Sequence, residues 1–330
     1  MKRIELVEFL KGYSILTIIL FHFLQRLQIP NIGGKLIGFG GTGVHLFILL
    51  SGFGLYYSHV HKPLGFIAFL KKRISKIYFP YIAIVLVSAL ITLFIPIYQN
   101  SWYALGGHIF LYKMFDESII GSYGYPLWFI SMIIQFYLVF NLLVWFKVKI
   151  GNKWFIVICL IISLLWTGLV IGLGKETLRV WNSFFLRYLW EFAIGMVIAY
   201  EFKRNNYQFK ISIKTSYILI IGLVNCALYA GLALKGGEIG KMTNDIPALI
   251  GYSSLAIWVY LAGIKVINSF FLYTGKISYS MYLLHTLVLM IVLYQMETVN
   301  LYIALVIALI SVYLISGLFQ KSVNFICQKL

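Results

Sequence analysis

The first apolar segment of the chain carries a lysine and a histidine, Lys11 and His22, at a spacing that could serve chemistry. Eleven residues at about 100° each make about three helical turns plus 20°, so both side chains lie on one face of a helix, about 16 Å apart along its axis. The spacing predicts a cation at the membrane edge and an imidazole near mid-bilayer, where ionisable groups are costly and usually functional. A buried, neutral imidazole can act as a general base. The alternative is a histidine that only hydrogen-bonds a neighbouring helix.

Glu8 lies one turn before Lys11 and can pair with it on the helix surface. A lysine at the end of a membrane helix often serves only as a snorkelling anchor, so the spacing to His22 is what marks Lys11 as a candidate. We predict that Glu8, Lys11 and His22 form a catalytic group on one helix.

The composition predicts a membrane protein that spans the bilayer several times. The chain has 330 residues, of which 61% are hydrophobic and only 11% are charged, and its mean hydropathy is +0.91. Soluble domains carry about 25% charged residues. The net charge of +17 does not indicate nucleic-acid binding, because the basic residues cluster in short segments between apolar runs, as topology signals do.

Apolar runs of about 20 residues, the length that crosses a bilayer, predict an all-α bundle of about ten transmembrane helices. These runs are residues 10–28, 41–58, 77–97, 126–146, 154–172, 181–200, 213–234, 247–267, 277–296 and 300–320. Nineteen of the 27 lysine and arginine residues fall on the N-terminal side, seven fall on the other, and Arg187 lies within a span. Positive residues stay inside, so both termini are predicted to be cytoplasmic. Without a polar linker, we expect a single integral-membrane domain, 1–330.

A basic cluster follows the second predicted span. Residues 59–76 are predicted to form a cytoplasmic loop that ends in Lys71, Lys72, Arg73 and Lys76. The cluster could serve as a topology signal that contacts anionic lipid, or Lys72, Arg73 and Lys76 could hold the phosphates of a cytoplasmic ligand.

Two other connecting stretches are notable. Residues 98–125 are predicted to be the longest outer loop, and its His108 is expected on the solvated surface, as are His59 and His61. The glycine-rich stretch 32–43 would allow close backbone packing or a bent entry into the second span.

Further ionisable residues lie within the predicted spans. His285 follows Lys276 by nine residues, about 14 Å of helical rise, and could bind substrate or make a polar contact between helices. Arg187 and Glu191 are four residues apart and could pair within one helix, facing protein or water. They could equally line an acceptor site. No nucleotide-binding glycine loop and no zinc spacing occurs, so no metal is expected.

Taken together, these segments resemble the integral-membrane acyltransferase 3 family, over nearly the whole chain and in the same order. The matching positions are Glu8, Lys11, Gly12 and His22, then residues 43–53, 73–78 with Pro80, 127–131, 135–137 and 275–285. Family members usually carry Arg at the position of Lys11, and often Asp at that of His45. Acidic residues are common where this chain has Ile133 and Ile134.

The resemblance implies an O-acyltransferase, with acetyl the usual group, that uses cytoplasmic acyl-CoA as donor and a hydroxyl of a surface or extracytoplasmic polysaccharide as acceptor. It implies His22 as general base or acyl carrier, with Lys11 and Glu8 beside it, and Arg73, Lys76 and Lys72 on the donor phosphates. The expected substrate-binding residues are His285, Arg187, Glu191, Trp128 and Tyr282. No permanently bound cofactor, a plasma-membrane location and no nucleic-acid partner are expected.

A rival prediction is an exporter of a polysaccharide or lipid-linked sugar that transfers no acyl group. Ten spans with sparse buried charges would suit it. Transporters often show inverted repeats with helices broken at corresponding positions, and the sequence has no convincing internal repeat.

Overall fold

The computed structural model describes residues 4–27, 29, 37–209 and 212–329, and in these all regular elements are helices, which confirms the all-α prediction. The chain divides into two compact units. Unit 1 comprises Met1–Leu64 and Phe140–Lys276, and unit 2 comprises Gly65–Val139 and Ile277–Leu330.

Unit 1 is built mainly from six helices and three short 3₁₀ turns. The helices are α1 (Glu5–Leu24), α3 (Gly43–His61), α8 (Leu189–Arg204), α9 (Thr215–Thr243), α10 (Asp245–Leu261) and α11 (Lys265–Lys276), with the short α7 (Arg179–Asn182) before α8. The turns are η1 (Gln25–Leu27), η2 (Phe39–Thr42) and η5 (Phe185–Tyr188). Helix α6 (Trp128–Gly172) belongs to unit 1 from Phe140 onward.

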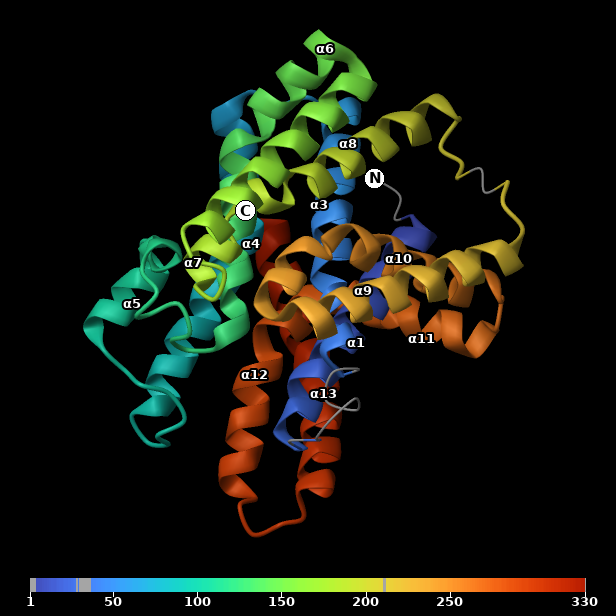
Figure 1. Cartoon of the computed structure of the whole chain (residues 1–330). Helices are drawn as coiled ribbons and strands as arrows, with labels where there is room; N and C mark the ends of the chain where they lie inside the picture. Colours follow the sequence, from blue (N-terminus) through green and yellow to red (C-terminus); the bar gives the residue numbers. More distant parts are fainter. Residues whose placement is uncertain (1–3, 28, 30–36, 210–211, 330) are drawn as a thin grey trace. The chain divides into compact units, whose positions relative to one another are not determined.

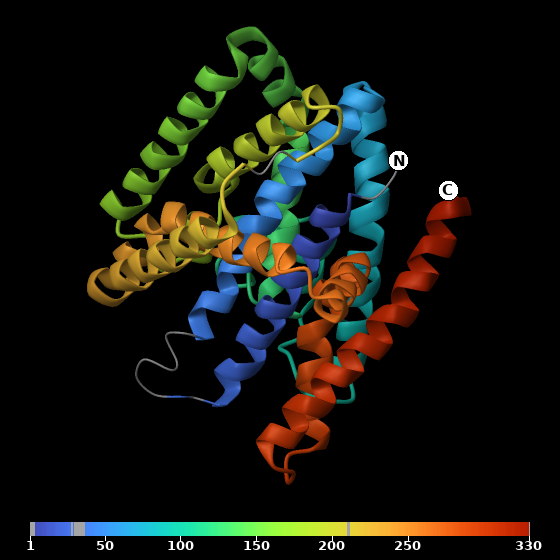
Figure 2. The same ribbon diagram turned by 90° about the vertical axis from the view of Figure 1, so that its right-hand side faces the viewer.

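Unit 2 contains α4 (Phe66–Thr92), α5 (Trp102–Ile109), the start of α6, α12 (Ser278–Gln295) and α13 (Leu301–Lys329), with turns η3 (Tyr112–Phe115) and η4 (Tyr125–Leu127). Helices α12 and α13 form an antiparallel pair (Figures 1 and 2). Ser280 of α12 donates to Gln320 of α13 at 2.9 Å, which fixes their register.

Eight stretches in the described part of the chain are long and apolar enough to cross a membrane. One of them, Tyr125–Gly172, contains the predicted fourth and fifth spans. The predicted eighth span lies on α10, which is shorter than the others. Each predicted span therefore overlaps a helix, whereas the total of ten crossings and their orientation stay predictions.

The long helix α6 reverses direction at Gly151. This residue has φ 79° and ψ 165°, a conformation open to glycine because it has no side chain. Figure 2 shows the green helical segment running upward, turning sharply and running back down. One continuous helical segment thus supplies two predicted spans with almost no loop between them.

Glycine contacts bring helix backbones together in unit 1. A Cβ on Gly52 of α3 would lie 2.1 Å from the carbonyl oxygen of Phe192 in α8, and one on Gly195 would lie 2.0 Å from that of Leu49. Between η2 and α1, a Cβ on Gly40 would lie 2.6 Å from the Thr17 oxygen. The predicted close packing of the stretch 32–43 is therefore confirmed at Gly40, while residues 32–36 lie outside the described residues.

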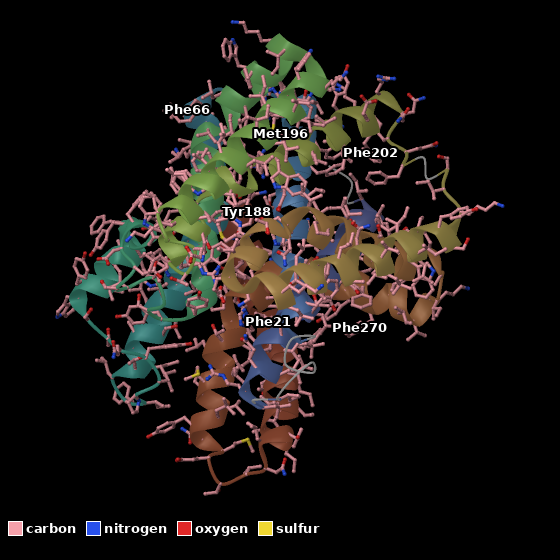
Figure 3. All side chains as sticks on the ribbon, viewed as in Figure 1. Phe21, Phe66, Tyr188, Met196, Phe202 and Phe270 are labelled. Carbon is pink, nitrogen blue, oxygen red and sulfur yellow. The ribbon has the colours of Figure 1, made fainter. Side chains whose placement is uncertain are left out.

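The outward faces of several helices are apolar. Exposed leucine, isoleucine and valine side chains follow α9, α13 and the second half of α6, among them Leu165, Leu223, Val306, Leu314 and Leu318. Figure 3 shows the side chains that project from the helices. Such faces are stable against lipid tails rather than against water, which supports the membrane assignment.

Candidate functional site

Four ionisable side chains of unit 1 meet in one buried cluster: His45, Arg187, Glu191 and Asp245. His45 lies in the first turn of α3, Glu191 in the first turn of α8, and Asp245 is the first residue of α10. Arg187 lies on the 3₁₀ turn η5 that leads into α8. The ends of three helices therefore converge here, and residues far apart in the sequence become neighbours.

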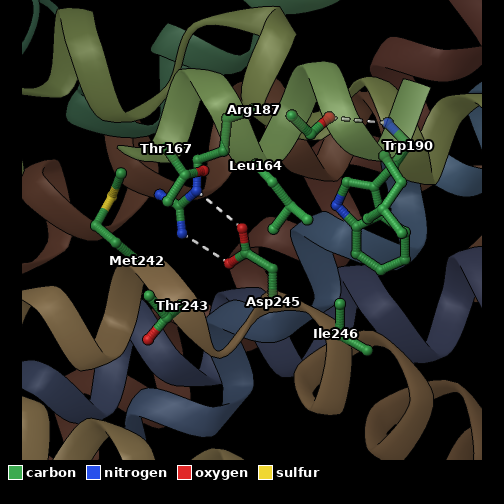
Figure 4. A pocket seen from close by; sticks show the side chains of 10 residues that line it. Leu164, Thr167, Arg187, Trp190, Met242, Thr243, Asp245 and Ile246 are labelled. Atoms are coloured by element: carbon green, nitrogen blue, oxygen red, sulfur yellow. Dashed lines mark hydrogen bonds and ion pairs between the residues drawn. The ribbon is translucent and has the colours of Figure 1, made fainter. Parts of the chain in front are cut away.

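Arg187 donates two parallel hydrogen bonds to Asp245 (Figure 4). Its Nε donates to Oδ2 at 2.9 Å and one terminal nitrogen donates to Oδ1 at 2.7 Å. The other contacts of the guanidinium are the backbone oxygens of Lys241 and Asn182, both at 3.0 Å. This bidentate geometry orients the carboxylate as well as neutralising it.

The predicted pairing of Arg187 with Glu191 is wrong. Arg187 pairs with Asp245, and Glu191 pairs with His45. The reason is local: Arg187 lies on a 3₁₀ turn before α8 begins, so the two residues do not stand one turn apart on a common α-helix.

Glu191 holds the imidazole of His45. Its Oε1 lies 2.6 Å from Nδ1 of His45, and the other ring nitrogen, Nε2, lies 3.7 Å from Oδ1 of Asp245. The Glu191 side chain is fully buried, and the Oε2 atom finds no hydrogen-bond partner in the described part of the chain. The ring of Tyr188, labelled in Figure 3, stands edge-on to the imidazole, with centroids 5.7 Å apart.

A pocket of about 80 Å³ adjoins this cluster. Arg187 and Asp245 form its polar side, and Trp190, Leu164 and Met242 form its apolar walls (Figure 4). A polar pair beside an aromatic wall is typical of sites for small polar ligands.

His45, Glu191 and Asp245 are also the group that could hold a metal ion, because one ligand atom from each lies within 4.8 Å of the others. Two features oppose this use. Arg187 already occupies both oxygens of Asp245, and the two nitrogens of His45 face different carboxylates. The cluster is therefore better suited to binding a proton than to binding a divalent metal ion.

Helix α1 carries Glu8, Lys11 and His22 without interruption, which confirms that the three residues share one helix. Lys11 pairs with Glu8 at 3.2 Å, as predicted. His22 lies in the last turn of α1, next to the ring of Phe21. His22 therefore lies near the end of its helix, which begins at Glu5, where the acidic Glu5 and Glu8 favour the N-terminus. Its depth near mid-bilayer stays a prediction.

The predicted basic loop 59–76 is largely helical, since α3 continues to His61 and α4 begins at Phe66. Lysine and arginine are good helix formers, so charge alone does not end a helix. Lys72 and Lys76 are exposed, whereas Arg73 is half-buried over the ring of Phe69 at 5.8 Å. The Nε of Arg73 is buried and makes no hydrogen bond in the described structure.

The predicted substrate-binding residues fall into both units. Arg187 and Glu191 belong to the cluster of unit 1, whereas Trp128, Tyr282 and His285 lie in unit 2. Tyr282 donates to the Pro126 oxygen at 2.7 Å, and His285 is fully buried with Nδ1 2.8 Å from the Tyr282 oxygen.

The stretch 98–125 buries a histidine and a lysine, so the surface position expected for His108 is wrong. His108 and Lys113 are both fully buried. Burial lowers the pKa of His108 to about 2, with the nearby Lys113 contributing, and burial lowers the pKa of Lys113 to about 7. Helix α5 and turn η3 enclose both side chains, where a solvated loop was expected.

Comparison with known families decides the identity of the chain. A family model described as an acyltransferase domain, that of acyltransferase 3, matches residues 4–321. The chain belongs to the acyltransferase 3 family. Searches of curated proteins and of solved structures gave no match. This acyltransferase is thus a multi-pass membrane protein, and the family domain covers nearly its whole length.

Sequence reasoning missed one member of the cluster in this acyltransferase, Asp245, and did not place His45 in it. A signal for Asp245 was present, because an acid directly before an apolar run at the edge of a span is costly unless it has a partner. Its partner Arg187 lies 58 residues earlier, so the pair itself could not be predicted from local spacing.

Proposed function

We propose that this protein is an O-acyltransferase that moves an acyl group from cytoplasmic acyl-CoA to a hydroxyl of an extracytoplasmic or surface polysaccharide. Acetyl-CoA is the proposed donor, and the plasma membrane is the proposed location, with both termini in the cytoplasm. The observation that carries the proposal is the family match over residues 4–321 of a chain built from apolar helices. The acyltransferase needs no permanently bound cofactor in this scheme, because the thioester supplies the activated acyl group.

The proposed donor site is the basic face at the start of α4. Lys72 and Lys76 are exposed there, and the buried Nε of Arg73 has an unused N–H. A guanidinium with an unused donor is suited to an anionic oxygen. These features support a role for the three residues in binding the phosphates of acyl-CoA.

The proposed reacting group is His22 at the end of α1. We assign it one of two roles: it removes the proton of the acceptor hydroxyl, or it carries the acyl group between donor and acceptor. Lys11 and Glu8 would serve the donor side of the same helix. Arg187 and Glu191, and separately Trp128, Tyr282 and His285, are proposed to line the acceptor path in their respective units.

The test compares surface polysaccharides from cells with and without the protein by mass spectrometry. We expect an ester mass increment on the glycan that depends on the protein and is lost in His22→Ala while the variant is still inserted in the membrane. Purified protein in liposomes should consume acetyl-CoA when the glycan is present. Movement of glycan across the liposome without consumption of acetyl-CoA would instead establish an exporter.

A further inference from the structure

His45 and Glu191 form a histidine–carboxylate pair of the kind that activates a hydroxyl. The carboxylate side chain is fully buried, whereas the imidazole keeps 14% of its side-chain surface exposed. A buried acid that orients a partly accessible imidazole is the arrangement by which enzymes hold a general base in one tautomer.

The geometry fixes which ring nitrogen is the base. The ionised Glu191 can only accept a hydrogen bond, so Nδ1 of His45, at 2.6 Å from Oε1, carries the proton. Nε2 then has a lone pair. Its nearest carboxylate oxygen, Oδ1 of Asp245, lies 3.7 Å away, beyond hydrogen-bond distance. Nε2 is therefore able to accept a proton.

Charge balance favours proton uptake by the cluster. With a neutral His45, the two carboxylates and Arg187 leave one net negative charge. With a protonated His45, the cluster is neutral. Because buried charge is costly unless it is compensated, Glu191 and Asp245 both stabilise the imidazolium that forms, whereas the positive charge of Arg187 opposes it.

The cluster adjoins the pocket, and the end of α1 that carries His22 packs against turn η2, which precedes α3. Asp245, which faces Nε2, also lines the pocket. The last turns of α1 contact η2, where a Cβ on Gly41 would lie 3.3 Å from the ring of Phe21, the neighbour of His22. Turn η2 leads directly into the first turn of α3, which carries His45. A hydroxyl in the pocket would thus contact the same carboxylate that faces the base.

We propose that His45 removes the proton from the acceptor hydroxyl, with Glu191 as its positioning residue, and that His22 is therefore the acyl carrier. This inference rests on the proposed function. In the first step, the C–S bond of the thioester breaks and a C–N bond forms on the His22 ring. The sulfur keeps the electron pair and takes the ring N–H proton, which gives the CoA thiol.

In the second step, the acceptor oxygen bonds to the acyl carbon as its proton passes to Nε2 of His45. The C–N bond breaks, and the His22 nitrogen keeps the electron pair and takes the proton that His45 had received. Both rings return to their starting state, and the sum is acyl-CoA plus hydroxyl giving ester plus CoA thiol.

The first experiment separates the two steps in His45→Gln. Membranes that contain each variant and the native glycan are incubated with radiolabelled acetyl-CoA. General bases contribute about 100-fold or more, so we expect glycan labelling to fall at least about 100-fold while label accumulates on the peptide that contains His22. His61→Gln, which removes an exposed histidine from the same helix, should behave as wild type.

The outcomes distinguish this inference from the proposed function. Glycan labelling by His45→Gln at the wild-type rate overturns the inference and leaves the acyltransferase proposal standing. Loss of glycan labelling without label on His22 also overturns it. If the wild type labels no glycan and releases no CoA, the proposed function fails, and this inference fails with it.

The second experiment needs no activity. Diethyl pyrocarbonate modifies neutral, accessible imidazoles, and mass spectrometry reports each site in the purified protein. We expect His45 to react, and its reactivity to change in Glu191→Gln, because the carboxylate that fixes the tautomer and orientation of the ring is gone. The assay covers about three pH units, from about pH 6 to 9, a range that includes the ordinary pKa of imidazole. The inference is overturned if His45 stays unreactive over this whole range while His61 reacts.

Discussion

The Nζ atom of Lys113 lies 3.4 Å from Nε2 of His108, and both side chains are fully buried in unit 2. The Nε2 atom also contacts Oγ of Ser122 at 2.9 Å, and this hydroxyl donates its proton to the Ile119 oxygen at 2.6 Å. Nε2 must therefore donate to Ser122, and Nδ1 accepts from the hydroxyl of Tyr81 at 2.7 Å. Lys113 faces an N–H group, so its neutral amine fits this site and its ammonium does not.

Replacing this lysine by methionine should change how stability depends on pH. The folded pKa of Lys113 is lowered to about 7, from an ordinary value of 10.5. Between these values the unfolded chain binds more protons than the folded one, so the lysine makes the free energy of unfolding rise with pH, by up to about 1.4 kcal/mol per pH unit. We expect Lys113→Met to be more stable than wild type at pH 7, with an advantage that shrinks as pH rises.

Thermal unfolding in detergent at several pH values measures this difference. The exposed Lys214→Met is the matched control and should track wild type at each pH. A constant difference between Lys113→Met and wild type from pH 7 to 10 would show that Lys113 is charged in the folded protein.

The glycine contact between α3 and α8 makes a second prediction. A Cβ on Gly52 would lie 2.1 Å from the Phe192 oxygen, so Gly52→Ala must push the two helices apart. We expect a loss of about 1–3 kcal/mol, seen as a lower melting temperature. On the same helix, Gly54 meets nothing within 4 Å, so Gly54→Ala should be neutral or stabilising by up to about 1 kcal/mol. Equal melting temperatures for the two variants would contradict the packing.

The buried pair Arg187–Asp245 leads to a third prediction. Arg187→Met would leave the Asp245 carboxylate buried without its main partner, which typically costs about 3–5 kcal/mol. Adding Asp245→Asn removes that charge, so the double variant should recover part of the loss. A double-mutant cycle measured by unfolding tests this. The exposed pair Lys241–Glu238 is the control, with an expected effect of at most about 1 kcal/mol. Additive effects at Arg187 and Asp245 would argue against the pair.

The proposed donor site leads to a fourth prediction. Lys76→Gln and Arg73→Gln should each raise the KM for acetyl-CoA several-fold and weaken its dependence on salt, because a phosphate contact is lost. Lys214→Gln, at another exposed lysine, should leave KM unchanged. The measurement is acetyl-CoA consumption by the protein in liposomes. An unchanged KM for acetyl-CoA in both test variants would show that the donor phosphates do not bind at α4.

The helices were predictable because long apolar runs have few alternatives in a membrane. The prediction failed where a charged residue was assumed to be exposed to solvent. Lys147 directly follows the predicted span 126–146 and is one of the nineteen basic residues expected on the N-terminal side of the membrane. It is buried, with Nζ 4.2 Å from the ring centre of Tyr200 and 3.2 Å from the Tyr56 hydroxyl. Composition cannot foresee such aromatic partners, because they come from two other helices.

The candidate site was predictable only in part. The pairing of Glu8 with Lys11 depends on spacing within one helix and was correct. The cluster around His45 depends on where three helix ends meet, and periodicity carries no information about that. The 3₁₀ turn Phe185–Tyr188, which precedes α8, was enough to make the predicted partner of Arg187 wrong.

Gly12 of α1 and Gly275 of α11 touch each other's helix through the backbone. A Cβ on Gly12 would lie 1.9 Å from the Phe271 oxygen, and one on Gly275 would lie 1.9 Å from the Glu8 oxygen. The neighbours of these glycines are Lys11 and Lys276, so the contact joins the first and last of the segments that resemble the family. Two stretches far apart in the sequence thus constrain each other: a side chain gained at either glycine would have to be matched by a shift of the helix that it meets.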